Sequence, residues 1–235
     1  MCGRFTMTAK QRKLFEKFLA RNMPELIARY NIVPSQPVLT VREEPESKQR
    51  QAAICTWGLV PFWSKDPNIS RSLNNARSES AAFKPAFKGP MRHHRCLIPA
   101  NGFYEWKRTG NQKLPHYFQR PEGELFAIAG LWDHWGSPDG SEIESCTILT
   151  TTPNKEMASV HHRMPVIIEE VEFDRWLSTE TQRASDVEDL LRPAPDGFFE
   201  RYPVTDLVNN ARNDGPELMQ RADIQPEFEQ GELFT

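Results

Sequence analysis

The feature that most limits the fold of this chain is a series of short apolar or alternating segments separated by turn-forming residues. The sequence of 235 residues contains 19 prolines, and many Gly, Asn and Asp residues stand between these segments. Short runs bounded by such residues are typical of β-strands. We predict strands at residues 29–33, 37–41, 52–60, 95–100, 102–108, 116–120, 125–132, 146–152 and 164–169.

Helices are expected to be fewer. Residues 8–22 form an amphipathic pattern with Thr8 as the expected N-cap. Its apolar face holds Leu14, Phe15, Phe18 and Leu19. Later helices are predicted at 153–160, 169–178 and 185–192, and exposed hairpin loops at 42–51 and 136–142. Because strands outnumber helices and do not alternate with them, we expect an α+β fold whose mainly antiparallel sheet is curled or barrel-like, with peripheral helices.

The length fits one domain with a full hydrophobic core. We expect this domain to cover residues 1–218, followed by a flexible tail over residues 219–235, with the chain loosely held from Pro216 onward. The net charge of −3 shows no basic excess, so a bound polyanion must meet local positive charge. The N-terminus has no apolar run, and no stretch approaches membrane-spanning length. We therefore expect a cytoplasmic protein with no membrane partner.

The cysteines and histidines do not form a metal-binding pattern. The cysteines at positions 2, 55, 96 and 146 lie far apart and show no CxxC spacing, so neither a zinc site nor a disulfide framework is indicated. Two pairs of adjacent histidines occur, at 93–94 and 161–162. A metal needs three or four convergent ligands, and adjacent residues rarely bind one ion together. We expect a reducing compartment, no metal and no other cofactor.

Cys2 is the most unusual residue of the sequence, because it follows the initiator methionine directly. Removal of Met1 would leave one residue with two nucleophiles, a thiol and a free α-amine. The simpler alternative is a small residue at a frayed chain end. The rest of the sequence has to decide between these two interpretations.

Several further motifs follow in a fixed order after the N-terminal CGRF. They are RYNIVPSQPV (29–38), WGLVPFW (57–63) with NNARSES (74–80), IPANGFYEWK (98–107) and VHHRMPVI (160–167). Together these stretches resemble the SRAP family, the SOS response-associated peptidase domain that crosslinks to abasic sites in DNA. The resemblance runs from Cys2 to about Ile168, with a weaker echo in residues 202–218. It implies a single SRAP-like domain that senses abasic sites in single-stranded DNA and protects them during the DNA damage response.

The chemistry of an N-terminal cysteine agrees with that substrate. Its amine condenses with an aldehyde to an imine, and its thiol then closes a thiazolidine ring. An abasic deoxyribose supplies the aldehyde whenever its sugar ring opens. Because an α-amine has a pKa of roughly 7.7 to 8 and a thiol about 8.5, we expect both groups of Cys2 to be partly nucleophilic near neutral pH. Met1 removal becomes a condition for activity.

The resemblance implies catalytic roles for three more residues. Glu105 would be the acid–base carboxylate, and its place between aromatic residues on a strand predicts a pKa raised by desolvation. Asn75 would orient the terminal amine or hold the sugar. His161 would assist opening of the sugar ring, with a pKa close to the working pH. The structural alternatives are the polar face of a strand for Glu105 and turns for the other two.

Binding of single-stranded DNA requires aromatic platforms and scattered cations. The residues on or beside the motifs that we expect to contact DNA are Arg4, Pro34, Phe62, Trp63, Asn75, Arg77 and Trp106. Phe62 would offer a smaller stacking surface than a tryptophan, and Trp57 is more simply a core residue.

The far C-terminus carries a second signal. Gln230, Leu233 and Phe234 of QGELF (230–234) resemble the QxxLF motif with which bacterial replication and repair proteins dock on the sliding clamp. QRKLF (11–15) matches the same pattern and is more simply the buried face of the first helix. The terminal copy is the candidate for a sliding-clamp partner because a chain end is accessible.

Two other functions stay open at this point. One is an N-terminal-nucleophile cysteine peptidase, in which Cys2 attacks an amide and Glu105 or His161 is the base; the family name implies such an activity, including self-processing that releases Met1. Reversal of the crosslink would add a lyase step. The other is a noncatalytic DNA-binding or clamp-tethered module, for which Cys2→Ala leaves binding intact.

Overall fold

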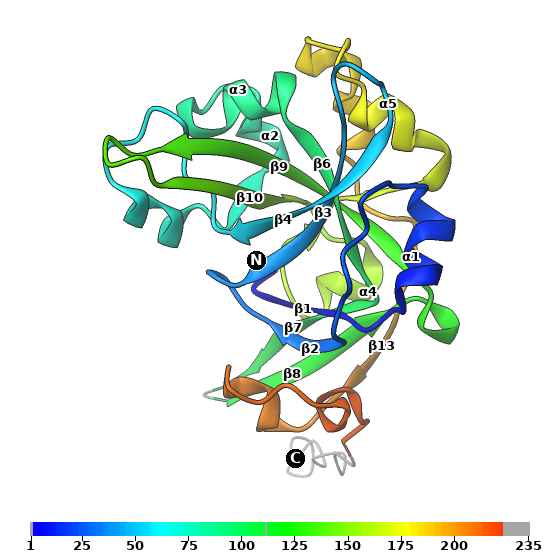
Figure 1. Cartoon of the computed structure of the whole chain (residues 1–235). Helices are drawn as coiled ribbons and strands as arrows, with labels where there is room; N and C mark the ends of the chain where they lie inside the picture. Colours follow the sequence, from blue (N-terminus) through cyan, green and yellow to red (C-terminus); the bar gives the residue numbers. More distant parts are fainter. Residues whose placement is uncertain (1, 111, 223–235) are drawn as a thin grey trace, which may run out of the picture.

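The protein contains two β-sheets with short helices around them (Figure 1). The computed structural model describes residues 2–110 and 112–222. In the described part of the chain, no helix combines the length and the apolar character needed to span a bilayer.

The larger sheet closes into a five-stranded barrel. Around the barrel the order is β10 (Glu142–Thr151), β4 (Arg50–Trp57), β3 (Pro37–Glu43), β6 (Arg95–Ala100) and β9 (Phe126–Gly136), and β9 pairs again with β10. These neighbours are antiparallel except β4 and β10, which run parallel where the ring closes. The expected curled, mainly antiparallel sheet is confirmed.

Three short strands extend the barrel at one end. They are β5 (Asn75–Arg77) and β11 (Met164–Pro165), which both pair with β10, and β12 (Ile167–Ile168), which pairs with β9. The predicted strand at 164–169 is split because the backbone of Val166 bonds to Leu149 on one side and Ala129 on the other. The strand predicted at 52–60 ends at Trp57, where Gly58 adopts a φ of 130°.

The second sheet carries the N-terminus in its interior. Its order is β13 (Glu200–Pro203), β8 (Gln112–Gln119), β7 (Gly102–Thr109), β1 (Arg4–Met7) and β2 (Arg29–Ile32), all antiparallel. Since β1 has a hydrogen-bonded neighbour on each side, the start of the chain is not a frayed end. β1 (RFTM) and β13 (ERYP) were not predicted, because each mixes charged or polar residues with apolar ones and neither forms an apolar run.

Both sheets share one large hydrophobic core. Phe5 of β1 packs edge-on against Trp57 of β4 with 5.3 Å between ring centroids, and both side chains are buried. This confirms Trp57 as a core residue. Since side chains alternate along a strand, Phe103 faces this core while Tyr104 faces a second, smaller one that includes Val208 and Leu218.

Helix α1 (Gln11–Phe18) is shorter than the predicted helix at 8–22. Thr8 is not its N-cap, because the backbone N–H and the hydroxyl of Thr8 both contact the side chain of Asn101. Its buried face is also narrower than expected, since Phe15 and Leu19 are 53% and 63% exposed.

The other helices have four to nine residues. α2 (Ser78–Ala81) and α3 (Pro85–His93) were not predicted. The helices predicted at 153–160 and 169–178 correspond to α4 (Lys155–Ala158) and to a 3₁₀ turn (Glu170–Glu172) followed by α5 (Phe173–Leu177). The helix predicted at 185–192 is wrong. Two 3₁₀ turns (Ala184–Asp186, Glu188–Leu190) stand there, separated by Val187 with a φ of −130°.

The chain from Pro216 to Ala222 was expected to be loosely held, but it keeps specific contacts to the domain although most of its residues are exposed. Pro216–Met219 forms a 3₁₀ turn whose Leu218 is fully buried. The backbone N–H of Ala222 donates to the carbonyl of Pro203 at 2.9 Å. The predicted tail motif with Gln230, Leu233 and Phe234 lies outside the described residues, so clamp binding stays a prediction.

Candidate active site

Strand β1 places Cys2 inside the protein. β1 pairs with β7 in a register that joins Arg4 to Tyr104, so the residues before Arg4 run beside Glu105. The side chain of Cys2 is fully buried, and its Sγ lies 4.0 Å from the carbonyl oxygen of Arg4. The carboxylate of Glu105 acts electrostatically on this thiol.

Asn75 contacts Cys2 directly. Its side-chain amide donates a hydrogen bond of 2.9 Å to the Cys2 carbonyl oxygen. Asn75 begins β5, which pairs in parallel with β10 through a register that joins Asn75 to Ile148. The NNAR segment is therefore a strand at this point and not a turn.

His161 and Glu105 face each other across the site. The Nδ1 atom of His161 lies 3.9 Å from Oε1 of Glu105. His161 precedes β11, and its position is fixed by Arg163, which donates two hydrogen bonds of 2.6 and 2.9 Å to the Glu79 carboxylate and a third to the carbonyl of Thr150. β10 thus holds the segments of Asn75 and His161 on the same end of the barrel.

The backbone of Arg163 offers a partner to either protonation state of His161. Nδ1 lies 3.1 Å from the Arg163 N–H and 3.0 Å from the Arg163 carbonyl oxygen. A neutral ring with an unprotonated Nδ1 accepts from the N–H, whereas a protonated ring donates to the carbonyl. The imidazole can therefore change its charge without changing its position.

The environment moves the pKa values of this pair in opposite directions. Burial raises the pKa of Glu105 above its ordinary value of 4.5, as predicted from the sequence. Burial lowers the pKa of His161 below its ordinary value of 6.5, and the guanidinium of Arg108 acts in the same direction. The imidazole is therefore neutral at pH 7, further from its working range than expected.

The thiol of Cys2 is not ionised in this state. Burial raises its pKa well above the ordinary value of 9.0, and the charge of Glu105 adds to the increase. The expectation that the thiol is partly nucleophilic near neutral pH is wrong for this buried arrangement, because it treated Cys2 as a solvated chain end.

An open cavity of about 470 Å³ leads to Glu105 and His161. Its other walls are formed by Arg4, Trp106, Arg108, Lys113 and Asn209. Three of these wall residues are cations, so the cavity is positively charged around a buried acid–base pair. Over residues 2–110 and 112–222, no three His, Cys, Asp or Glu side chains are grouped so that they could hold a metal ion.

Comparison with known proteins shows the family of this chain. The sequence model of the SOS response associated peptidase (SRAP) family matches residues 1–211. The chain belongs to the SRAP family. The expectation drawn from CGRF, NAR, GFYEW and HxRMP is therefore confirmed.

Named relatives of this SRAP chain are abasic site processing proteins. YoqW of Bacillus subtilis (strain 168) is 38% identical over 224 residues, which cover 94% of this chain and 99% of YoqW. HMCES of Gallus gallus is 32% identical over 220 residues, which cover 81% of this chain and 65% of HMCES. A solved structure of a protein from Bacteroides thetaiotaomicron has a TM-score of 0.83 at 26% identity and covers 94% of this chain and 100% of its own.

A C-terminal segment of the SRAP chain, residues 206–214, contributes Asn209 to the lining of the cavity; we call this segment the strap. Arg4 donates to the carbonyl oxygens of Val208 and Asn209, and its guanidinium lies 5.4 Å from the ring centroid of Trp106. The indole N–H of Trp106 donates to the Asn209 side chain at 2.7 Å. The strap therefore fixes two of the predicted DNA-contact residues.

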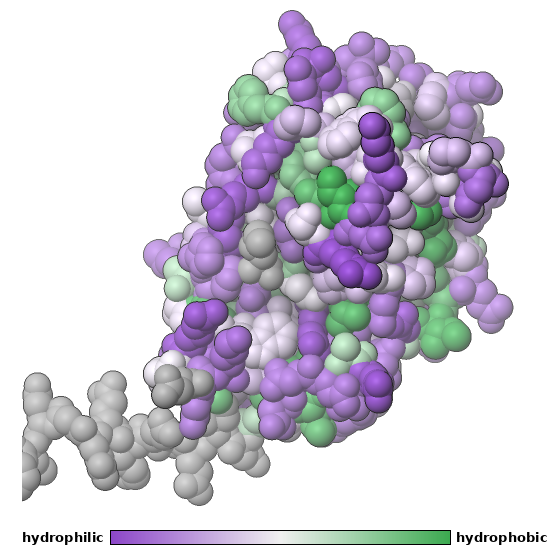
Figure 2. Space-filling view, turned by 90° about the vertical axis from the view of Figure 1, so that its left-hand side faces the viewer, coloured by the Kyte–Doolittle hydropathy of each residue, from purple (hydrophilic) through white to green (hydrophobic). Residues whose placement is uncertain are grey.

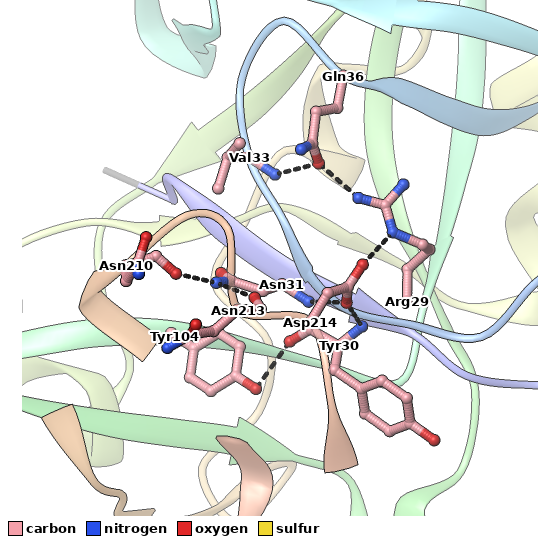
Figure 3. Close-up of polar contacts among 9 residues, drawn as sticks. All are labelled: Arg29, Tyr30, Asn31, Val33, Gln36, Tyr104, Asn210, Asn213 and Asp214. Carbon is pink, nitrogen blue, oxygen red and sulfur yellow. Dashed lines mark hydrogen bonds and ion pairs between the residues drawn. The ribbon is translucent and has the colours of Figure 1, made fainter. Parts of the chain in front are cut away.

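Strand β2 anchors the strap from the other side (Figure 3). The amide of the fully buried Asn31 donates to the carbonyls of Asn210 and Asn213 at 3.1 and 2.9 Å. Asp214 accepts from two backbone N–H groups of β2 and forms an ion pair with Arg29. β2 therefore holds the strap both through the strap's backbone carbonyls and through the side chain of Asp214.

The remaining DNA-contact candidates lie outside the cavity. Phe62 and Trp63 are 66% and 47% exposed in the loop after β4, and Trp63 lines a separate cavity formed with residues 64–66, 68 and 69. Arg77 is exposed at the end of β5, and Pro34 is half-buried in the turn between β2 and β3. Their contacts to DNA stay predictions.

The face of the molecule in Figure 2 is mainly hydrophilic and carries small, separate hydrophobic patches. This distribution differs from the continuous apolar patches that mark many protein–protein interfaces.

Sequence reasoning missed Arg108, Lys113, Asn31 and Asn209. The first two lie in an unremarkable polar hairpin, RTGNQK. A signal for Asn209 was present, because NNAR occurs twice, at 74–77 and at 209–212. The structure places both copies beside the candidate site, since Asn75 contacts Cys2 and Asn209 lines the cavity.

Proposed function

We propose that this protein processes abasic sites in single-stranded DNA and that Cys2, once Met1 is removed, forms a covalent thiazolidine with the abasic sugar. The adduct would protect the lesion from strand cleavage. The observation that carries the proposal is a chain of contacts: Asn75 hydrogen-bonds to Cys2, the charge of Glu105 acts on the Cys2 thiol, and Glu105 faces His161 in a cationic cavity. The names of the relatives YoqW and HMCES support the choice of substrate.

The reaction needs two condensation steps. The Cys2 amine adds to the C1′ aldehyde of the ring-opened sugar, and the carbinolamine loses water to give an imine. The thiol sulfur then adds to the imine carbon while its proton passes to the nitrogen, which closes the five-membered ring. The net change is the loss of one water.

Each polar residue has a role in this scheme. Glu105, with its raised pKa, can protonate the departing hydroxyl of the carbinolamine and afterwards accept a proton. The neutral His161 is placed to remove the proton of the sugar hydroxyl as the ring opens. Asn75 orients the Cys2 backbone through its carbonyl, which directs the amine toward the aldehyde.

The buried thiol favours this order of steps. With its pKa raised by burial, the Cys2 sulfur is a poor first nucleophile, so the amine attacks first. The same fact argues against the second candidate, a cysteine peptidase, whose thiolate must attack an amide at once. Cleavage of a peptide substrate in the absence of DNA would favour the peptidase instead.

The proposal is tested by incubating Met1-processed protein with a single-stranded oligonucleotide that contains one abasic site. A denaturing gel should show a retarded band, and Cys2→Ala should remove it. Protein that retains Met1 should give no band although its fold is intact. Absence of the band in the processed wild type, or its persistence in Cys2→Ala, would overturn the proposal.

A further inference from the structure

The scheme above assigns no contact with the DNA to two cations at the mouth of the cavity. Arg108 and Lys113 stand directly opposite each other in the β7–β8 register. Both side chains are exposed, and both line the same cavity as Glu105 and His161. Their position therefore connects solvent with the candidate catalytic pair.

This cation pair is uncompensated. No ion pair or side-chain hydrogen bond joins Arg108 or Lys113 to another residue of the described chain. Like charges directly opposite on neighbouring strands destabilise a sheet. A bound anion would remove that repulsion, because it accepts hydrogen bonds from both side chains at once.

Arg4, the third cation of the cavity, is already engaged. Its guanidinium donates to the carbonyls of Val208 and Asn209 and stacks on Trp106. Its donors hold the strap, so a ligand anion entering the cavity meets the free donors of Arg108 and Lys113 instead. The guanidinium fork and the ammonium together suit a phosphate oxygen pair.

We propose that Arg108 and Lys113 form a phosphodiester-binding subsite that holds one backbone phosphate next to the abasic sugar. The inference rests on the proposed function, because a sugar that reaches Glu105 and His161 brings its flanking phosphates to the cavity mouth. Phosphate bound at this point would fix the register of the strand, so that the abasic sugar and not a neighbouring nucleotide faces Cys2.

The test measures noncovalent binding of a single-stranded oligonucleotide that carries a tetrahydrofuran abasic analogue, which has no aldehyde and cannot crosslink. Arg108→Gln, Lys113→Gln and the double variant are compared with wild type over a series of salt concentrations. Arg201→Gln is the matched control, because Arg201 is an exposed cation of β13 in the same sheet but outside the cavity. Thermal unfolding checks that all variants keep their fold.

The double variant should bind roughly tenfold more weakly, as expected for losing charge-assisted hydrogen bonds to one anion. The slope of log affinity against log salt should become shallower by about 0.7, the share of one phosphate on a single strand. Replacing one flanking phosphate by a neutral methylphosphonate should weaken DNA binding by wild type by the same factor as the double substitution does. It should leave the affinity of the double variant unchanged. Affinity and slope equal to those of Arg201→Gln, or a further loss with the methylphosphonate at every position, would overturn the subsite.

An acidic peptide serves as a competing probe. If it binds wild type but not the double variant, while the oligonucleotide binds both equally, the cations belong to a peptide site and the inference is wrong. Adduct formation with a true abasic oligonucleotide at saturating DNA separates the two proposals. No adduct in wild type, together with cation-dependent binding of the analogue, refutes the proposed function and supports the subsite. An adduct in wild type with control-like binding by the double variant refutes only the subsite.

Discussion

Glu105 and His161 show how one environment separates the pKa values of two groups. Both lose solvent, but desolvation disfavours the charged form, which is the deprotonated state of a carboxyl and the protonated state of an imidazole. Both shifts favour the neutral form: the carboxyl of Glu105 holds its proton to a higher pH, and the imidazole of His161 loses its proton at a lower pH. A pair with pKa values displaced in this way can divide acid and base duties.

Glu105→Gln should change the pH dependence of stability. In the unfolded chain the carboxyl titrates near its ordinary value of 4.5, and in the folded protein at a higher pH. Between these values the folded state holds a proton that the unfolded state lacks, so the free energy of unfolding falls as the pH rises through that window. Relative to Glu105→Gln, the free energy of unfolding of wild type should fall across this window. Above the window the difference between the two proteins should stay constant with pH.

Chemical denaturation of both proteins from pH 4 to pH 8 measures this difference. Because the variant keeps every other titrating group, the difference reports Glu105 together with its electrostatic effect on its neighbour His161. A difference that is constant with pH, or that grows in favour of wild type as the pH rises, would contradict the raised pKa.

At the residue scale, sequence motifs identified the catalytic candidates but not their state. Cys2, Asn75, Glu105 and His161 could be named because each stands in a distinct motif. The burial of the Cys2 thiol could not be predicted, since it depends on β1 pairing with β7 and β2, which are far away in sequence. Chemistry is visible in residue types, whereas desolvation arises only from tertiary contacts.

At the scale of elements, the strap matters most to the site. It lies between β2 and the cavity, and it positions Trp106 and Arg4 through Asn209. Alternating apolar patterns predicted most barrel strands, but the strap has no such pattern. The Asn31 contacts use the strap's backbone carbonyls, which every residue type offers, so the strap sequence carries little record of them. Only the contacts of the Asp214 side chain depend on a particular residue type.

Asn31→Ala should loosen the strap. The change removes a buried amide and leaves the carbonyls of Asn210 and Asn213 without their donor, at a cost of about 1–3 kcal/mol in the free energy of unfolding. Adduct formation should also slow, because Asn209 no longer fixes Trp106. Arg212→Ala is the control, since Arg212 is an exposed strap residue. Equal denaturation midpoints for the two variants would contradict the anchoring role of Asn31.

At the scale of the whole molecule, the candidate site joins distant parts of the chain. Cys2 comes from the residues just before β1, Glu105 from the small sheet, His161 from the end of the barrel and Asn209 from the strap. The α+β class and the curled sheet could be predicted from strand patterns, whereas the closure of the barrel through the parallel β4–β10 pair could not. That pair depends on contacts between residues almost 90 positions apart, such as Thr56 and Ser145.

Truncation from the C-terminus tests how far the site depends on the strap and on the residues after it. A chain that ends at Ala222 should unfold and form adducts like the full chain, but should lose any binding to a sliding clamp along with Gln230, Leu233 and Phe234. A chain that ends at Thr205 loses Val208 and Leu218, both fully buried. At about 1.5–3 kcal/mol for each such side chain, it should be several kcal/mol less stable and form adducts slowly. Thermal unfolding and adduct yield measure both effects; equal behaviour of the two truncations would contradict the role of the strap.

The most direct test of the central claim is the intact mass of the adduct between Met1-processed protein and an abasic oligonucleotide. A thiazolidine predicts the sum of the two masses less one water, located on the peptide that begins with Cys2 and stable to denaturation. Cys2→Ser can form the imine but not the sulfur ring, so its adduct should hydrolyse when the protein is denatured. An equally stable adduct of Cys2→Ser, or one formed by protein that retains Met1, would contradict the account.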